Sequence, residues 1–223
     1  MKITLFILIV IGFLNSLLAQ ISPDEALAKL MEGNKRFLTG KSIRPNQTIE
    51  KVKELASGQK PFAVIVGCSD SRVPNEIIFD QGLGDIFIIR TAGQVSSYAS
   101  WGSMEFAVTS LNSKLILVLG HTKCGAVSAA CTVPEVPGHI VTLINAIKPA
   151  AEIAKEMDGD LVENVVKVNV AKQVEQLKNL EPVLSKKVKN GEIKIVGAVY
   201  HIENGKVELI PDNYLNKISK EKK

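Results

Sequence analysis

The chain has few aromatic residues and few histidines: 5% of its 223 residues are Phe, Trp or Tyr, and three are His. No segment interleaves aromatic residues with Lys and Arg, so nucleic acid is not an expected partner despite the net charge of +4. Internal repeats, low-complexity tracts and Pro- or Gly-rich linkers are also missing, which argues against a repeat array or several domains. Hydrophobic residues make up 46% of the chain and charged residues 22%, which excludes a disordered protein.

Cysteine is scarce as well, with three residues and no Cys-x-x-Cys pair. An odd number excludes a framework in which every cysteine is paired, and the missing Cys-x-x-Cys argues against a thiol redox protein. Cys131 ends the small, mostly apolar run of residues 126–131, where we expect it to be a buried small hydrophobic side chain. A disulfide between Cys124 and Cys131 is an alternative that the sequence leaves open.

One long hydrophobic run, residues 5–14, is present shortly after Lys2 at the start of the chain. Together with the Leu-Leu-Ala-Gln of residues 17–20, it is typical of a secretory signal peptide, and it is short for a bilayer span. We expect cleavage after Ala19. Residues 1–19 are then the signal peptide, and residues 20–223 form one mature domain, periplasmic or secreted and free of the membrane. An uncleaved membrane anchor is the alternative.

Short runs rich in Val, Ile and Leu predict strands buried on both faces of a sheet, at residues 62–66, 85–89, 114–119 and 193–199. Helical segments lie between them, at residues 75–79, 98–111, 125–131, 140–157 and 162–188. Strands that alternate with helices predict an α/β fold with a mostly parallel sheet flanked by helices. Ser22 and Pro23 predict the start of an N-terminal helical arm. Asn204-Gly205 predicts a hairpin with a type I′ turn.

Two polar motifs follow the predicted strands. Cys68-Ser-Asp70-Ser-Arg72 comes directly after the first strand, and His121-Thr-Lys-Cys124 comes directly after the third. Both motifs therefore belong at the carboxyl ends of parallel strands, where open α/β sheets place their ligands. Two thiolates and an imidazole are ligands that Zn²⁺ prefers, and three protein ligands leave a fourth position open. We predict one Zn²⁺ per chain, bound by Cys68, His121 and Cys124.

Asp70 has two possible roles beside such a metal. It can fill the fourth position itself and close the site, or it can accept a hydrogen bond from a zinc-bound hydroxide. Arg72 is near enough in sequence to pair with Asp70 through two hydrogen bonds and to hold it off the metal. Because zinc lowers the pKa of bound water toward neutrality, the second role makes the site catalytic. A non-catalytic zinc-binding protein, closed by Asp70, is the alternative from another class.

With these motifs the chain resembles the β-class carbonic anhydrases, zinc lyases that interconvert carbon dioxide and bicarbonate. The resemblance rests on Cys68-Ser-Asp70-Ser-Arg72-Val and Gly120-His121-Thr-Lys-Cys124-Gly125-Ala. It covers residues 22–210 and extends through residues 26–37, Asp85-Ile-Phe-Ile-Ile-Arg90-Thr-Ala92-Gly93 and the closing strand at residues 196–200. It implies that Cys68, His121 and Cys124 bind zinc and that Asp70 and Arg72 form a catalytic dyad. It also implies a homodimer or homotetramer in which the N-terminal helices embrace the partner.

The substrate implied by the resemblance is CO₂ or bicarbonate, and Val73, Phe79 and Val95 are the neighbouring apolar residues that we expect around it. A hydrolase of CS₂ or COS on the same scaffold is the enzymatic alternative, because loops and oligomeric tunnels decide which substrate reaches the metal.

Overall fold

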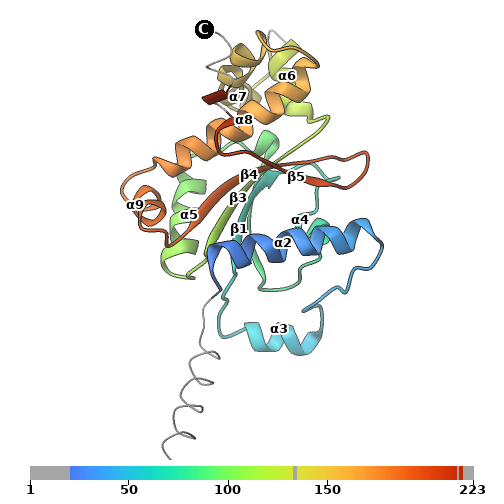
Figure 1. Cartoon of the computed structure of the whole chain (residues 1–223), viewed down its shortest axis with the longest axis vertical. Coiled ribbons are helices and arrows are strands. Elements are labelled where there is room, and N and C mark those ends of the chain that lie inside the picture. Colours follow the sequence, from blue (N-terminus) through green and yellow to red (C-terminus); the bar gives the residue numbers. More distant parts are fainter. Residues whose placement is uncertain (1–20, 133–134, 215, 218–223) are drawn as a thin grey trace, which may run out of the picture.

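The computed structural model describes residues 21–132, 135–214 and 216–217, so the predicted signal peptide lies outside the described residues. At the centre is a sheet of five strands in the order β2-β1-β3-β4-β5 (Figure 1). The strands are β1 (Ala63–Cys68), β2 (Ile86–Thr91), β3 (Leu115–His121), β4 (Lys194–Tyr200) and β5 (Val207–Ile210). The first four are parallel, and β5 runs antiparallel to β4. The predicted α/β class with a mostly parallel sheet is confirmed.

Helices cover both faces of this sheet because successive strand residues point to opposite sides. Ile65 and Leu117 pack beneath α2 (Pro23–Leu38) and α4 (Asn75–Ile78). Val64 and Val118 pack on the opposite face, against α5 (Tyr98–Thr109) and α8 (Leu161–Lys178). Burial on both faces explains why these strands appear in the sequence as continuous apolar runs.

A third apolar cluster lies at the carboxyl ends of the strands. It combines Cys68 and Cys124 with residues of α6 (Gly125–Thr132), α7 (Ile140–Ala154) and α8, and Figure 1 shows these three helices grouped at one end of the molecule. The remaining elements are α3 (Ile49–Leu55), α9 (Leu184–Lys189) and the short 3₁₀ turn η1 (Ala92–Gln94). Among the helices of the described ranges, none has the length and hydrophobicity that crossing a bilayer requires.

The long helix predicted over residues 162–188 is wrong. Instead, α8 ends at Lys178 and a separate helix, α9, begins at Leu184. Pro182 lies in the gap, and proline can neither donate a backbone hydrogen bond nor leave the preceding residue free to be helical.

The type I′ turn at Asn204-Gly205 is also wrong, although β4 and β5 are antiparallel as predicted. A type I′ turn needs positive φ at both residues, and here Gly205 has φ +80° while Asn204 does not lie in that region. The Asn204 side chain instead accepts a hydrogen bond from the Lys206 amide at 2.9 Å. The buried Asn34 of α2 donates to the Gly205 carbonyl at 3.0 Å and accepts from the Val207 amide at 3.0 Å. Contacts with a distant helix therefore decide the shape of this loop.

Helix α2 begins at the predicted cap: the Ser22 hydroxyl accepts from the Glu25 amide, and the Glu25 carboxylate accepts from the Ser22 amide. Further along, α2 crosses the end of α4 at Gly33. A Cβ atom built on Gly33 would lie 1.8 Å from the backbone carbonyl oxygen of Phe79. Only glycine fits at this crossing.

Gly33→Ala is therefore expected to lower the free energy of unfolding by about 3 kcal/mol, at the upper end of the range for overpacked cores. Gly102→Ala is the matched control, because Gly102 also lies within a helix, and a Cβ atom added there would meet no described atom within 4 Å beyond its own helix backbone and chain neighbours. That control should raise the stability by up to about 1 kcal/mol. Urea denaturation measures both, and equal midpoints for Gly33→Ala and the parent would contradict the close crossing.

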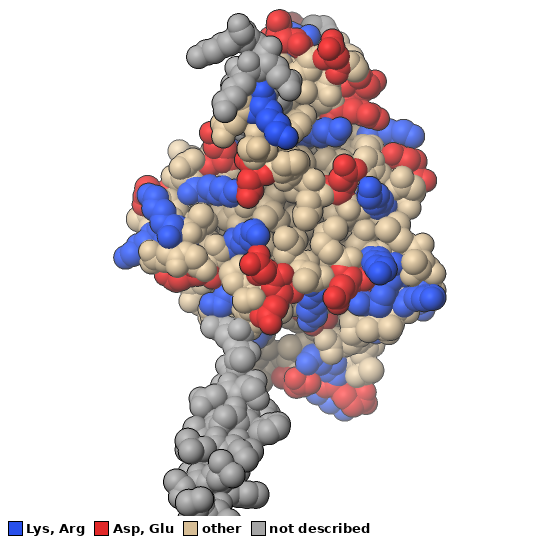
Figure 2. Space-filling view, in the orientation of Figure 1, with Lys and Arg blue, Asp and Glu red and all other residues tan. Residues whose placement is uncertain are grey.

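Charged side chains of both signs are interspersed on the face shown in Figure 2. Elsewhere on the described surface as well as here, charged side chains form ion pairs with one another; Lys194 pairs with Asp24 at 2.8 Å and Lys178 with Asp212 at 2.9 Å. Exposed pairs of this kind contribute about 0–1 kcal/mol each. On this face neither sign of charge gathers into a single patch.

Candidate metal centre

The three predicted ligands meet at one edge of the sheet. Cys68 is the last residue of β1 and His121 the last of β3, and these two strands are parallel neighbours. Cys124 follows within three residues, immediately before α6. Among the described residues, these three form the one group of His, Cys, Asp or Glu side chains whose ligand atoms all lie within 4.8 Å of one another. Their exposed fractions are 4%, 0% and 1%, so the group is enclosed by protein.

The imidazole of His121 is oriented for metal binding. Its Nδ1 lies 2.9 Å from the carbonyl oxygen of Thr122, which accepts the Nδ1 proton and leaves Nε2 with a free lone pair. Nε2 is buried and has no hydrogen-bond partner in the part of the chain that the structure describes. A buried nitrogen without a partner is costly, and a cation between it and the two sulfurs removes that cost. The donor set, two sulfurs and one imidazole, fits zinc.

The two thiols share their protons unequally. The pKa of Cys68 is lowered to about 4, chiefly because the Cys124 thiol donates a hydrogen bond to its sulfur. Smaller contributions come from His121 and from the amides of Asp70 and Gly93. The pKa of Cys124 is raised, because it is the donor to Cys68 and is buried. Metal binding needs both sulfurs as thiolates, so a bound cation would displace the proton that the pair shares.

All three cysteines are free thiols, so the alternative of a disulfide between Cys124 and Cys131 is not realised. Cys131 lies on α6, partly buried, and its pKa is raised mainly by burial. It is not a member of the ligand group.

Asp70 and Arg72 form the predicted pair at the mouth of this group. Arg72 donates from Nε to Oδ1 of Asp70 at 2.9 Å, from Nη2 to Oδ2 at 2.7 Å, and from its amide to Oδ1 at 2.9 Å. These hydrogen bonds hold the pKa of Asp70 well below its ordinary value, so the carboxyl group is ionised. Oδ2 lies 3.8 Å from Nε2 of His121. The carboxylate thus faces the metal site while Arg72 holds it.

Two contacts at the site were not predicted from the sequence, although the residues that make them lie in a stretch that carries the family resemblance. Arg90 donates to the carbonyl oxygens of Cys68 at 2.8 Å and of Asp70 at 2.7 Å, and so clamps the loop that carries both residues. The Gly93 amide donates to the sulfur of Cys68 at 3.2 Å. Arg90 and Thr91, the last two residues of β2, pair with Gly67 and Cys68 of β1. Gly93 comes two residues after the end of β2. The sequence predicts both strands, and pairing β1 with β2 in parallel would have placed Arg90 and Gly93 beside Cys68.

The three apolar residues expected around the substrate are divided between two places. Val95 packs against the cluster that contains Cys68 and Cys124. Val73 and Phe79 are fully buried in the core beneath α2 and α4. Of the three, only Val95 therefore packs against the cluster to which Cys68 and Cys124 belong.

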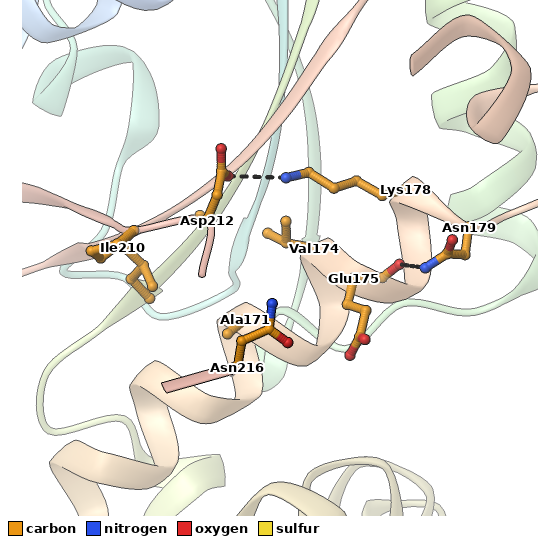
Figure 3. A pocket seen from close by; sticks show the side chains of 10 residues that line it. Ala171, Val174, Glu175, Lys178, Asn179, Ile210, Asp212 and Asn216 are labelled. Carbon is orange, nitrogen blue, oxygen red and sulfur yellow. Dashed lines mark hydrogen bonds and ion pairs between the residues drawn. The ribbon is translucent and has the colours of Figure 1, made fainter. Parts of the chain in front are cut away.

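A separate cavity of about 210 Å³ lies between α8 and β5 (Figure 3). Ala171, Val174 and Ile210 line it with apolar surface, and the ion pair of Lys178 and Asp212 lies at its rim. None of the residues predicted to bind metal or to form the dyad lines this cavity. The candidate site is therefore the ligand group at the ends of β1 and β3.

Comparison with known proteins gives consistent results. A family model described as carbonic anhydrase matches residues 63–207. The protein called carbonic anhydrase 2 in Mycobacterium tuberculosis is 41% identical over 194 residues, which cover 84% of this chain and 93% of that protein. The carbonic anhydrase of Mycolicibacterium smegmatis is 40% identical over 192 residues, covering 84% of this chain and 93% of that protein.

Solved structures of β-carbonic anhydrases have the same fold. CcaA superimposes with a TM-score of 0.66 at 26% identity, covering 83% of this chain and 95% of its own. A tetrameric β-carbonic anhydrase from Sordaria macrospora also gives a TM-score of 0.66 at 26% identity, covering 71% of this chain and 85% of its own.

Proposed function

The chain belongs to the β-class carbonic anhydrase family of enzymes, and we propose that it catalyses the reversible hydration of CO₂ at one Zn²⁺ ion bound by Cys68, His121 and Cys124. The observation that carries the proposal is the enclosed group of two sulfurs and an unpartnered imidazole nitrogen, with an ionised carboxylate beside it. A purely structural zinc site has no need of an arginine that holds a fourth potential ligand away.

Zinc, when bound, supplies a Lewis acid that makes water a competent nucleophile near neutral pH. Asp70 accepts a hydrogen bond from this nucleophile and directs its lone pair toward the carbon of CO₂. Arg72 occupies both carboxylate oxygens, keeps Asp70 ionised and restrains it from moving onto the metal. Arg90 fixes the backbone on which Cys68 and Asp70 stand. The proton released in each turnover passes to buffer.

The metal and the substrate are tested together on purified residues 20–223. Elemental analysis should give one zinc per chain. Initial rates should then be compared for CO₂, COS and CS₂ on the same zinc-loaded sample. The proposal expects CO₂ to be by far the best substrate, whereas a higher kcat/KM for CS₂ or COS would assign the enzyme to the rival hydrolase activity. A sample that binds zinc but converts none of the three substrates would support the alternative of a non-catalytic zinc-binding protein.

The proposed location is outside the cytoplasm, either periplasmic or secreted. It rests on the layout of residues 1–19 alone, in which Lys2 precedes a hydrophobic run and Ala19 offers a cleavage site. Expression of the whole chain in a bacterial host, followed by fractionation and N-terminal sequencing, tests it. A mature chain that starts at Gln20 outside the cytoplasm is expected, and an intact chain in the membrane fraction would support the anchor instead.

The proposed assembly is a homodimer or homotetramer. Support comes from apolar side chains left exposed on α3 and on the segment after α4: Ile49 is 64% exposed, Val52 50% and Leu83 45%. Val52 and Leu83 line one shallow hollow. Light scattering on the mature protein measures the mass directly. A monomer at micromolar concentration would contradict this part of the proposal.

A further inference from the structure

The turn η1 contacts the ligand group through the backbone amide of Gly93. The Gly93 amide donates to the sulfur of Cys68 at 3.2 Å, in a fully buried setting. This is the shorter of two amide contacts to that sulfur, since the Asp70 amide lies at 3.4 Å. An N–H donor on a metal-binding thiolate fixes the direction of the sulfur and withdraws part of its charge.

The conformation that aims this amide is an unfavourable one. Gly93 has φ +65° and ψ 21°, and Gln94, which is not a glycine, has φ +47°. Glycine adopts the left-handed region freely, but a residue with a Cβ atom does not, so the turn is strained at Gln94 and persists only where the surroundings hold it. A Cβ atom on Gly93 would lie 2.7 Å from Cδ1 of Ile147 and 3.3 Å from Cβ of Ala126, so α6 and α7 press on the turn from outside.

The group that holds the turn from the other side is Asn169 of α8. Its Nδ2 donates to the Gly93 carbonyl oxygen at 3.2 Å, and the side chain is 3% exposed. Asn169 interrupts an otherwise apolar buried stretch that includes Val165, Val166, Val168 and Val170. Burying an amide side chain among valines costs free energy unless the amide is hydrogen-bonded. The hydrogen bond to Gly93 offsets this cost, and an apolar side chain would serve packing alone equally well.

The two hydrogen bonds are linked through one residue. The Gly93 N–H and C=O flank the same Cα, so a bond that fixes the carbonyl also limits the rotation that would turn the amide away from Cys68. We propose that Asn169 is a positioning residue for the metal centre: by holding the Gly93 carbonyl, it keeps the Gly93 amide on the Cys68 sulfur. It thereby slows the loss of the metal and limits the charge that this thiolate donates to it.

This inference rests on the proposed zinc site. Its consequences are changes in the affinity for the metal and in the spectrum of a bound Co²⁺ ion, not in the rate of turnover. Hydrogen bonds to metal ligands are typically worth about 10- to 100-fold in metal affinity. Without the amide, the sulfur of Cys68 is a stronger electron donor. The transfer of charge from sulfur to a bound Co²⁺ ion then needs less energy, and the corresponding absorption band moves to longer wavelength.

The test uses Asn169→Leu, which keeps the volume but cannot donate, and Asn169→Ser, whose hydroxyl is too short to reach Gly93 and can bond its own helix instead. Ser113→Ala is the control, because Ser113 is fully buried and donates one bond to the Pro61 carbonyl at 2.8 Å. That bond lies at the amino ends of β1 and β3, opposite the metal. Zinc release to a chromogenic chelator and the spectrum of the Co²⁺ protein are recorded for each full mature chain.

Both Asn169 variants should release zinc at least about tenfold faster than the parent and should shift the sulfur-to-cobalt band to longer wavelength. Ser113→Ala should lower the melting temperature without either change. Parent-like zinc release and an unmoved band in a folded Asn169 variant would overturn the inference, and so would equal acceleration by Ser113→Ala. Failure of the proposed function is distinguishable, because it would appear as a parent that binds zinc and does not hydrate CO₂.

Discussion

Cys124→Ala is expected to abolish CO₂ hydration and to purify with little zinc. The change removes one of three buried ligands and leaves a thiol and an imidazole, which are too few to hold the metal in a closed setting. Without zinc, the pKa of water stays far above neutrality and water supplies little hydroxide at neutral pH, so the rate should fall by at least about three orders of magnitude. Zinc content and stopped-flow hydration are the measurements.

Cys131→Ser is the matched control for this change. Cys131 is the third thiol of the chain and lies on the adjacent helix α6, but it is not one of the metal-binding group. Its replacement should leave one zinc per chain and parent-like hydration. Retention of zinc and activity by Cys124→Ala, or their loss in Cys131→Ser, would contradict the assignment of the ligands.

The second large effect is expected from Asp70→Asn. The variant should keep its zinc and lose CO₂ hydration by about a hundredfold or more, because an amide cannot replace the charged acceptor that orients the nucleophile. The pKa of Asp70 is held below its ordinary value by the hydrogen bonds from Arg72. A depressed pKa means that the carboxylate takes up a proton only at acid pH. The parent therefore keeps Asp70 ionised throughout pH 6 to 9, and the loss should be present over that whole range.

Asp212→Asn serves as the control, since it removes a carboxylate from an exposed ion pair with Lys178 and leaves the ligand group untouched. It should hydrate CO₂ at the parent's rate. Full activity of Asp70→Asn would refute the dyad, and a loss of zinc in that variant would show that Asp70 acts as a ligand instead.

Much of the fold follows from local sequence, because strands buried on both faces appear as continuous apolar runs. Each of the four predicted strands is present, displaced by one or two residues toward the carboxyl end. Two predictions of local structure were wrong: one because a single proline broke an amphipathic pattern, the other because a distant residue shaped a loop. The apolar periodicity of a helix continues across Pro182, so the sequence predicts one helix where the structure has α8 and α9. The loop at Asn204 is shaped by hydrogen bonds from the buried Asn34, which the local sequence does not indicate.

The candidate site was predictable in part for a similar reason. Cys68 and His121 end neighbouring parallel strands, so strand order alone brings them together. The amide of Gly93 carries no side-chain signal, and its importance appears only once the turn is seen against the sulfur of Cys68. Asn169 did leave a trace in the sequence, as a polar residue between Val168 and Val170. Its partner could not be named without the fold, because 76 positions separate it from Gly93.

The central claim is that zinc at Cys68, His121 and Cys124 hydrates CO₂ with Asp70 held off the metal. Stopped-flow CO₂ hydration by zinc-loaded residues 20–223, measured from pH 6 to pH 9 with the zinc content of the same sample, tests it most directly. We predict saturable hydration well above the buffer rate at neutral and alkaline pH, lost on removal of zinc and restored by its return. A sample with one zinc per chain and no hydration between pH 6 and pH 9 would contradict the account.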